Sequence, residues 1–338
     1  MSETDAVITG ISGLVGGNLA RALLAQGYRV RGLIHRDRRA IQGLDIECFP
    51  GDVRDLDALR RIFTGAEVVY HLAAHISLET TEGLQAQVVN VLGTRNVVNA
   101  CLECDVERLV HVSSIHAVDP DRLDPRENES SAQPRVPSRL HYNHSKTGGE
   151  LEVRRGMADG LDAVILRPTG IIGPYDFKPS YLGRAILGLA HRKIPALVRG
   201  GFDWVDVRDV VDGMIQAQHK APSGGSYILS GHWRTVRAIA DQVALLTGVP
   251  APRLTVPLWM AYLGLPWMKI LAKIQKEEPL YTQVSLDALG SGQRISGDLA
   301  RRELNFSVRP FEETITDTVD WFAENGYLQF PGDLIGQS

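Results

Sequence analysis

The sequence AVITGISGLVG at residues 6–16 runs from a short apolar stretch into residues with the apolar spacing of a helix. Residues 6–9 predict a buried strand, and residues 14–26 predict a helix that ends at Gly27. Gly10 permits a sharp turn out of the strand, and Gly13 lets backbone N–H groups approach a pyrophosphate. Gly16 lets the helix pack closely on the sheet. The stretch therefore predicts a strand–turn–helix unit that binds a dinucleotide. It is not a P-loop, because no Gly-Lys-Ser/Thr follows.

Short apolar runs continue to alternate with helical stretches through the first half of the chain. Further strands are predicted at residues 28–34, 46–49, 68–71, 108–112 and 163–166, and helices at 56–63, 85–103 and 142–157. Continuous apolar strands that alternate with helices require a parallel sheet covered on both faces and wound by right-handed crossovers. We therefore expect an α/β fold of the Rossmann type, a doubly wound parallel sheet with a smaller C-terminal substrate-binding domain. Its ligands should bind beyond the carboxyl ends of the strands.

The alternation degrades after residue 170, where prolines interrupt the pattern. We expect residues 1–170, with a returning segment near 203–222, to form the dinucleotide-binding domain. Residues 171–202 and 223–338 should form the substrate-binding domain. An apolar stretch at residues 254–268 contains two prolines and is shorter than the ~20 residues that a membrane span needs. A core helix pair, or a lid over an apolar pocket, is favoured there over a membrane-surface anchor.

Composition excludes several classes of protein. The 338 residues are 44% apolar and 22% charged, with a net charge of −4, which describes an ordinary globular chain. That net charge gives no indication of electrostatic binding to nucleic acid or to an anionic membrane. The first five residues, Met-Ser-Glu-Thr-Asp, are polar rather than basic and apolar as in a secretory signal, and three cysteines cannot pair completely. We expect a cytoplasmic protein with reduced thiols, and we find no residue constellation for a metal.

The residues after the second predicted strand bear on the choice of cofactor. They read Ile34-His35-Arg36-Asp37-Arg38-Arg39. A carboxylate such as Asp37 would bind the ribose 2′-hydroxyl of NAD, whereas arginine side chains match the geometry of a 2′-phosphate. Because three arginines outnumber the carboxylate, we favour NADP over NAD and expect His35 and Arg36 to contact it. A solvated basic turn is the alternative interpretation.

Tyr142 and Lys146 are four residues apart on one predicted helix, so they project from the same face. A free tyrosine titrates near pH ~10, too high for a base near neutrality, but an adjacent ammonium favours the phenolate. The phenol could then exchange a proton with a substrate oxygen while a nicotinamide carries the hydride. Ser113 and Ser114, at the end of the 108–112 strand, offer a hydroxyl to hold that oxygen. A serine pair there is also typical of a helix cap or turn.

These motifs occur in a fixed order with others. Along the chain stand Thr9-Gly10-x-x-Gly13-x-x-Gly16, Gly51-Asp52-Val53, His71-Leu72-Ala73-Ala74, Asn90-Val91-x-Gly93-Thr94, Ser113-Ser114 and Tyr142-x-x-x-Lys146. Arg167-Pro168 with Gly173-Pro174, residues 204–210 and residues 302–328 continue the series. In order and spacing the chain resembles the extended short-chain dehydrogenase/reductase family over essentially its whole length.

The resemblance implies a role for each matching position. Tyr142 would be the general acid/base, Lys146 would orient the nicotinamide ribose and tune the tyrosine, and Ser114 would bind the substrate oxygen. The cofactor-binding residues implied are Gly10, Gly13, Leu14, Val15, Gly16, His35, Arg36, Asp52, Val53, Ala73, Lys146 and Pro168. Asp52 and Val53 would flank the adenine, and Ala73 would line the cofactor channel. The helices at 85–103 and 142–157 look like those that pair two family members into a homodimer through a four-helix interface.

Departures from the family's patterns narrow the activity. Ile115-His116 follows Ser114 where family dehydratases carry an acidic pair, and residues 167–174 lack the asparagine usual in nucleotide-sugar epimerases. The second half is rich in apolar and aromatic residues. Taken singly, each of them is expected to lie in the hydrophobic core: Trp204, Val256, Trp259, Met260, Tyr262, Leu263, Trp267 and Met268. In these respects the chain is similar to the dihydroflavonol reductase and 3β-hydroxysteroid dehydrogenase branches.

We therefore expect an NAD(P)-dependent oxidoreductase that interconverts a ketone or aldehyde and a secondary alcohol on a steroid-, flavonoid- or terpenoid-like small molecule. A nucleotide-sugar epimerase and a non-catalytic NADP-sensing protein are the alternatives. Participation of Asn90, His116 or His141 in proton relay is left open. The polar segment at residues 119–139 is expected to loop over the site.

Overall fold

The computed structural model describes residues 5–76, 83–118, 141–275, 281–291 and 295–329. Two compact units divide the chain. The first comprises residues 1–169, 207–230 and 295–307, and the second comprises residues 170–206, 231–294 and 308–338.

A seven-stranded sheet forms the centre of the first unit. Its strands are β1 (Asp5–Thr9), β2 (Arg29–Ile34), β3 (Glu47–Pro50), β4 (Val68–His71), β5 (Arg108–Val112), β6 (Ala163–Pro168) and β10 (Ser226–Leu229). They lie in the order β3-β2-β1-β4-β5-β6-β10, and every neighbouring pair is parallel. The Rossmann-type parallel sheet predicted from the sequence is confirmed. Chain order reverses between β1 and β4, and ligands of such sheets bind beyond the strand ends at that point.

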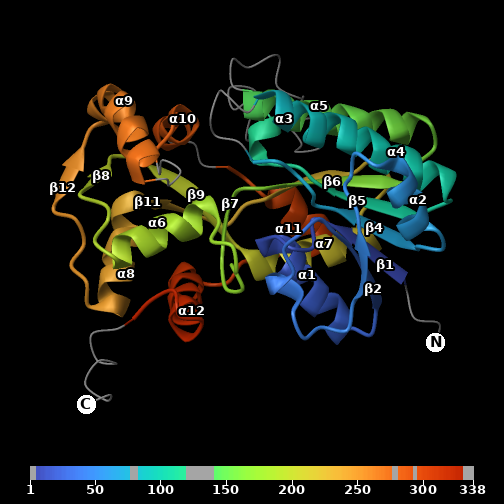
Figure 1. Ribbon diagram of the computed structural model, residues 1–338, viewed down its shortest axis with the longest axis horizontal. Helices are drawn as coiled ribbons and strands as arrows, with labels where there is room; N and C mark the ends of the chain where they lie inside the picture. Colours follow the sequence, from blue (N-terminus) through green and yellow to red (C-terminus); the bar gives the residue numbers. More distant parts are fainter. Residues whose placement is uncertain (1–4, 77–82, 119–140, 276–280, 292–294, 330–338) are drawn as a thin grey trace. The chain divides into compact units, whose positions relative to one another are not determined.

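Helices cover both faces of this sheet (Figure 1). On one face lie α2 (Leu56–Phe63), α4 (Thr94–Glu103) and α5 (His141–Ala158), and on the other lie α1 (Leu14–Ala25), α7 (Val207–Lys220) and α11 (Asp298–Leu304). The core beneath α2, α4 and α5 includes Val7, Ile62, Phe63 and Val97, none of which is exposed to solvent. Each large side chain buried in this way contributes roughly 1.5–3 kcal/mol.

Two features of this unit differ from the prediction. The helix expected over residues 85–103 is α3 (Gly83–Gln87), a π-helical turn (Val88–Gly93) and then α4. Strand β10 pairs with β6 in the large sheet, and α11 also belongs to this unit, although residues 223–338 were assigned to the second domain. Pairing with β10 covers the edge that β6 would otherwise expose. Two short 3₁₀ turns, Arg39–Ile41 and Ile115–Ala117, follow β2 and β5.

The second unit contains two small sheets. Strands β7 (Gly170–Ile172), β9 (Gly201–Asp206) and β11 (His232–Thr235) form one sheet, and β8 (Ala196–Val198) pairs with β12 (Leu254–Val256). Strand β9 therefore lies outside the dinucleotide-binding unit, although the predicted returning segment included it. The helices are α6 (Tyr181–Ala190), α8 (Val236–Thr247), α9 (Leu258–Gln275), α10 (Gln283–Ser291) and α12 (Phe311–Glu324). At residues 254–268, where a core helix pair or a lid over an apolar pocket was expected, the structure has strand β12 and the first part of helix α9, which contains Pro266. No helix in the described ranges is long and apolar enough to cross a membrane.

Candidate active site

Close packing requires two of the three glycines that follow β1. Gly10 has a φ of +75°, and a Cβ there would lie 2.7 Å from the backbone nitrogen of Ala73, just past the end of β4. A Cβ at Gly16 would lie 2.3 Å from the carbonyl oxygen of Gly10. Real Cβ atoms do not approach backbone atoms so closely, so Gly10 and Gly16 fix the turn and seat α1 against it. The Ala73 N–H donates to Thr9 Oγ1 at 3.3 Å, which holds the ends of β1 and β4 together.

Gly13 has a different setting, because no described residue packs tightly into the space beside it. The residue is exposed, and the nearest atom to a Cβ there would be the Gly10 oxygen at 3.4 Å, an ordinary contact. It is the N-cap of α1, which has no side-chain cap and no acidic residue in its first turn. The positive end of α1 therefore remains open to an anion. This arrangement fits the pyrophosphate of a dinucleotide, which Gly13, Leu14 and Val15 would hold through backbone N–H groups.

The carboxylate that follows β2 is held by an arginine. Asp37 accepts hydrogen bonds from Arg39 Nη2 at 2.6 Å and Nε at 3.1 Å. The Ser12 hydroxyl donates to the Asp37 carbonyl oxygen at 2.5 Å, so the loop after β2 lies against the glycine turn. His35 and Arg36 are exposed beside it. Because the Asp37 carboxylate already accepts from Arg39, it is a poorer acceptor for a ribose hydroxyl. The segment at residues 35–39 keeps a net positive charge.

Asp52 and Val53, which follow β3, are also anchored by neighbours. Asp52 accepts from Arg54 Nη2 at 2.8 Å and Nε at 2.9 Å, and these bonds hold the pKa of its carboxyl below the ordinary value. Val53 is buried, and a Cβ at Gly93 would lie 2.6 Å from its Cγ2 atom. The positions of Asp52 and Val53 at the carboxyl end of β3 are therefore fixed by their neighbours.

The serine pair after β5 divides into one accessible and one buried hydroxyl. Ser114 is half-buried and caps the 3₁₀ turn, with its Oγ accepting from the His116 N–H at 3.2 Å. Its own proton can therefore be donated elsewhere. Ser113 is buried, and its Oγ has no hydrogen-bond partner among the described residues. Thr147 Oγ1 lies 3.2 Å from the Ala117 carbonyl oxygen, which ties this turn to α5.

Lys146 on α5 is buried, with 8% of its surface exposed. Burial lowers the pKa of its ammonium from 10.5 to about 8, although the charge of Glu150 one turn later opposes the change. Tyr142 lies in the first turn of the same helix, four residues earlier, and its side chain is outside what the structure describes, as is that of His141. The predicted loop at 119–139 also falls outside the described residues.

A buried ion pair joins this helix to the sheet. Arg167 of β6 donates to Glu150 from Nε at 2.8 Å and from Nη2 at 2.7 Å, and neither side chain is exposed. A two-pronged contact of this kind fixes both the position and the rotation of α5. It thereby sets the place of Lys146, while Pro168 directly after Arg167 ends β6.

The sequence did not indicate the polar chain beneath these groups. His71 Nδ1 lies 2.7 Å from Thr9 Oγ1, and its Nε2 lies 2.9 Å from Thr94 Oγ1. The His111 ring on the neighbouring strand is centred 5.2 Å from that of His71. Burial lowers the pKa of His71 well below its ordinary value and that of His111 to about 3, so both rings are neutral near pH 7. Of this set only His111 lies outside the motifs that sequence analysis had quoted.

Asn90 lies in the π-helical turn and is hydrogen-bonded to two other segments. Its amide accepts from the His75 N–H at 2.7 Å and donates to the His75 carbonyl oxygen at 3.0 Å and to Ser145 Oγ at 2.9 Å. The Thr94 hydroxyl donates to the Asn90 carbonyl oxygen at 2.7 Å. Asn90 therefore links the segment after β4 to α5 through Ser145, one residue before Lys146.

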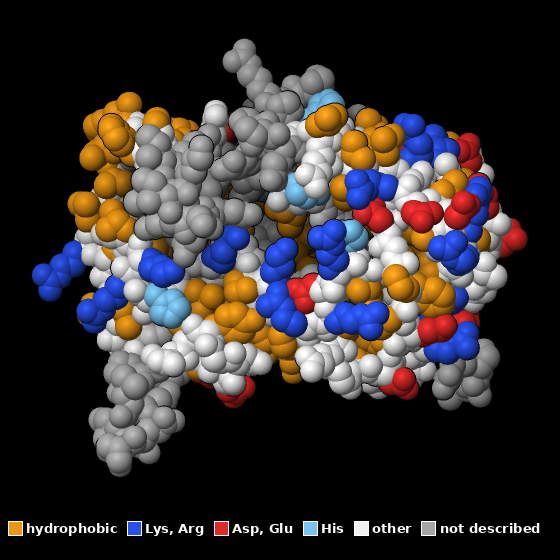
Figure 2. All heavy atoms as spheres, viewed as in Figure 1, with side chains coloured by type: hydrophobic (Ala, Val, Ile, Leu, Met, Phe, Trp, Pro, Cys, Tyr) orange, Lys and Arg blue, Asp and Glu red, His pale blue; other side chains and the backbone are white. Residues whose placement is uncertain are grey.

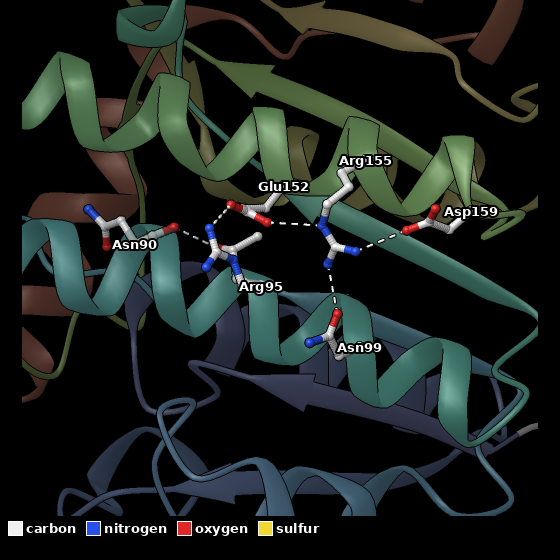
Figure 3. Close-up of polar contacts among 7 residues, drawn as sticks. Asn90, Arg95, Asn99, Glu152, Arg155 and Asp159 are labelled. Carbon is white, nitrogen blue, oxygen red and sulfur yellow. Dashed lines mark hydrogen bonds and ion pairs between the residues drawn. The ribbon is translucent and has the colours of Figure 1, made fainter.

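Helices α4 and α5 are joined along their length by polar contacts (Figure 3). Glu152 accepts from Arg95 of α4 at 2.7 Å and from Arg155 of its own helix at 3.2 Å. Arg155 also donates to Asn99 of α4 at 2.7 Å and to Asp159 at 2.9 Å. The two helices that the resemblance assigns to a dimer interface thus form one fixed pair within the chain.

The apolar residues of the second half do not share one environment. Trp204 on β9 is buried in the core of the second unit. Five residues of α9 are exposed, so the expectation that each is core is wrong for them: Trp259, Met260, Tyr262, Leu263 and Trp267. The sequence shows which residues are apolar, but not which side of α9 packs on the protein. The described residues contain no cluster able to hold a metal ion.

Comparison with known proteins agrees with this architecture. Residues 6–229 match a family model described as the NAD dependent epimerase/dehydratase family. Sterol demethylase protein B of Methylococcus capsulatus is 35% identical over 327 residues, which cover 95% of this chain and 99% of that protein. "Putative dihydroflavonol 4-reductase" of a Synechocystis species is 34% identical over 333 residues, 95% of each chain. The crystal structure of gox2253 superposes with a TM-score of 0.80 at 31% identity and covers 97% of this chain and 100% of that one.

Proposed function

Because the chain belongs to the NAD dependent epimerase/dehydratase family of extended short-chain dehydrogenases/reductases, we propose that it reduces a ketone or aldehyde, or oxidises the matching secondary alcohol, on a fairly apolar ring substrate. It is an oxidoreductase by its similarity to named reductases. The observation that carries the reaction type is Lys146, a buried cation on α5 four residues after Tyr142.

In this proposal, each of the three catalytic residues has a defined task. Bound NAD(P) supplies or accepts the hydride. Ser114 donates a hydrogen bond to the substrate oxygen, and Tyr142 transfers the proton to or from that oxygen. Lys146, still largely protonated near pH 7 with a pKa of about 8, stabilises the Tyr142 phenolate and binds the nicotinamide ribose.

Removing the phenol oxygen of Tyr142 tests this assignment. Tyr142→Phe removes the proton donor, so hydride transfer, followed by reduced-nicotinamide absorbance, should fall about 10²–10⁴-fold. Cofactor affinity, measured by fluorescence titration, should stay within about twofold of wild type, because the phenol is not a phosphate or ribose ligand in this scheme. Unchanged turnover across ring ketones, flavonoids and sterols would refute the role of Tyr142.

The choice of cofactor follows from the segment after β2. The family is NAD-dependent by description, and we propose that this member prefers NADP. Asp37 is held by Arg39, while Arg36 stands exposed in the same segment. A guanidinium in that place would pair with a 2′-phosphate. KM values for NADPH and NADH on one substrate decide between them.

The substrate class rests on the relatives. One is named a sterol demethylase protein and another a dihydroflavonol 4-reductase, and both names refer to polycyclic, weakly polar molecules. The family description also names epimerases, so nucleotide-sugar epimerisation is the second candidate. An epimerase would convert its substrate without net change in NAD(P)H, which chromatography of nucleotide-sugar mixtures would reveal. A cofactor sensor would transfer no hydride to any ketone.

We also propose a homodimer in a reducing, cytoplasmic setting. Leu92 of the π-helical turn before α4 and Leu151 of α5 are exposed at 46% and 53%, within the two predicted helices that family resemblance assigns to the interface. The three cysteines are free thiols. Sedimentation of wild type and Leu92→Arg should distinguish dimer from monomer.

A further inference from the structure

The ammonium of Lys146 lies among buried groups, several of which already bind other partners. Figure 2 shows Lys and Arg side chains on the face that it presents, the usual place for cations, whereas Lys146 is 8% exposed. A buried ammonium has three N–H donors, and leaving them without acceptors costs free energy. Both ring nitrogens of His71 are in hydrogen bonds with threonines, and the Glu150 carboxylate accepts two hydrogen bonds from Arg167. His71 and Glu150 are thus already committed to other groups.

Two polar side chains at the end of β5 have no such partner. Ser113 and His111 are 4% and 5% exposed, and neither Ser113 Oγ nor His111 Nδ1 has a hydrogen-bond partner among the described residues. Side chains two residues apart on a strand point to the same side, and Leu109, two residues before His111, packs in the core beneath α5. Both polar groups therefore face α5. Buried polar atoms in native proteins are almost always satisfied by a protein group or an ordered water.

Lys146 approaches the same groups from α5. It lies four residues before Glu150, so both side chains project from one side of the helix, and Glu150 contacts Arg167 of β6. The Ser113 N–H donates at 2.8 Å to the carbonyl oxygen of the β6 residue just before Arg167, which places Ser113 beside that contact. Burial lowers the pKa of His111 to about 3, and the charge of Lys146 is the next cause, as expected for an ammonium near that ring. The ammonium, the hydroxyl and the imidazole therefore converge on one buried region.

We propose that Ser113 and His111 hold an ordered water molecule that accepts a hydrogen bond from the Lys146 ammonium. Because neither Ser113 Oγ nor His111 Nδ1 accepts directly from a described residue, a bridging water is the group that satisfies all three side chains. Water suits His111 in either tautomer, since it can donate to a bare ring nitrogen or accept from an N–H. Ser113 and His111 are then positioning residues that favour the charged form of Lys146. The inference rests on the proposed function only in giving that charge a role in catalysis.

Other titratable side chains in the described ranges also surround Lys146. His71 on β4 is neutral near pH 7, because burial lowers its pKa well below the ordinary value. Glu150 of α5 and Arg167 of β6 are paired with each other. The π-helical turn at residues 88–93 carries no titratable side chain. Tyr142, one turn earlier on α5, has a side chain outside the described residues, so the experiment removes its phenol in a separate variant.

NMR of the full chain with ¹³C at the lysine Cε atoms measures the pKa of Lys146, and Lys146→Met identifies its signal. Ser113→Ala removes the hydroxyl, and His111→Leu removes the ring nitrogen. In each variant Lys146 should titrate about 1 pH unit lower than in wild type, a tenfold loss of proton affinity, since its charged form loses a hydrogen bond. His111→Asn, whose amide can occupy the place of Nδ1, should restore most of that difference.

The matched control is Ser226→Ala on β10, because Ser226 is also buried and its hydroxyl also has no partner within the described ranges. Lys146 should titrate in this control as it does in wild type. An equal change in Ser226→Ala would show that loosened packing, and not a lost acceptor, alters the pKa, and would overturn the inference. The difference between wild type and Ser113→Ala should persist when both carry Tyr142→Phe.

A second result would also overturn the inference. If Lys146 titrates at the wild-type pH in both Ser113→Ala and His111→Leu, no water held by these residues stabilises its charge. Because the NMR measurement needs no turnover, that result leaves the proposed function standing. Unchanged turnover of Tyr142→Phe, by contrast, refutes the proposed function and leaves the water site in place.

Discussion

Replacing Lys146 by methionine should abolish turnover and at the same time stabilise the fold. The ammonium is buried on α5, and burial lowers its pKa from 10.5 to about 8. Below pH 8 the folded protein keeps this charge away from water, which costs free energy that methionine, of similar length and apolar, does not incur. Function and stability therefore conflict at this position.

The size of the effect follows from the pKa. The pKa of Lys146 falls from 10.5 to about 8 on folding. At 1.36 kcal/mol per pH unit, this corresponds to a cost of about 3 kcal/mol for keeping the ammonium charged in the folded protein. Between these two pH values the unfolded chain holds a proton on Lys146 that the folded chain has released, so wild-type stability rises with pH in that window. Below pH 8 we expect the free energy of unfolding of Lys146→Met to exceed that of wild type by up to about 3 kcal/mol. Above pH 8 this difference, called the gap below, should shrink by about 1.4 kcal/mol per pH unit.

Urea unfolding from pH 6 to about 9.5, followed by far-UV circular dichroism, measures this gap. By pH 9.5 the gap should have narrowed by about 2 kcal/mol. Lys220→Met on α7 is the matched control, because Lys220 is exposed and lies in the same unit. A variant less stable than wild type at pH 7, or a gap that stays constant above pH 8, would refute the claim that Lys146 is buried as a strained cation.

Three further predictions concern the same unit. Gly16→Ala should lower the free energy of unfolding by about 1–3 kcal/mol through its clash with backbone, whereas Gly13→Ala should leave unfolding unchanged and weaken NADP(H) binding about tenfold in fluorescence titration. Glu150→Gln should cost about 3–5 kcal/mol in urea unfolding, because it leaves the Arg167 charge buried without its counter-ion. Arg36→Ser should raise KM for NADPH about tenfold with little change for NADH, since a 2′-phosphate contact is worth about 1–2 kcal/mol. Equal effects on both cofactors would contradict that assignment.

The sheet was predictable because its signals are local. The strands at residues 68–71 and 108–112 have the predicted bounds, since each is a short, largely apolar stretch followed by turn-forming or polar residues. The pairing of β10 with β6 was not predictable, because it depends on which edge of the sheet β6 leaves exposed, and no local pattern reveals that edge. The π-helical turn at residues 88–93 was missed because one extra residue in a turn barely changes apolar spacing.

For the candidate site, the sequence located residues better than it located their partners. The glycine turn is encoded within a few residues, and its geometry requires Gly10 and Gly16 as expected. The pairing of Asp37 with Arg39 was not predicted, because two residues so close in sequence can point in any direction until the turn after β2 is known. On α9, apolar composition could not show which side packs inward, since the helix is apolar on both.

Lys146 lies near several buried polar groups, and we compare the charge of each with that of its ammonium. Burial keeps His71 and His111 neutral near pH 7, and these rings lie on adjacent strands beneath the site. Glu150 and Arg167 neutralise each other within one contact. Within this described cluster, Lys146 is then the group whose charge changes near pH 8. A titration of stability near that pH is assigned to Lys146 if it disappears in Lys146→Met, because the His71 and His111 rings are already neutral there.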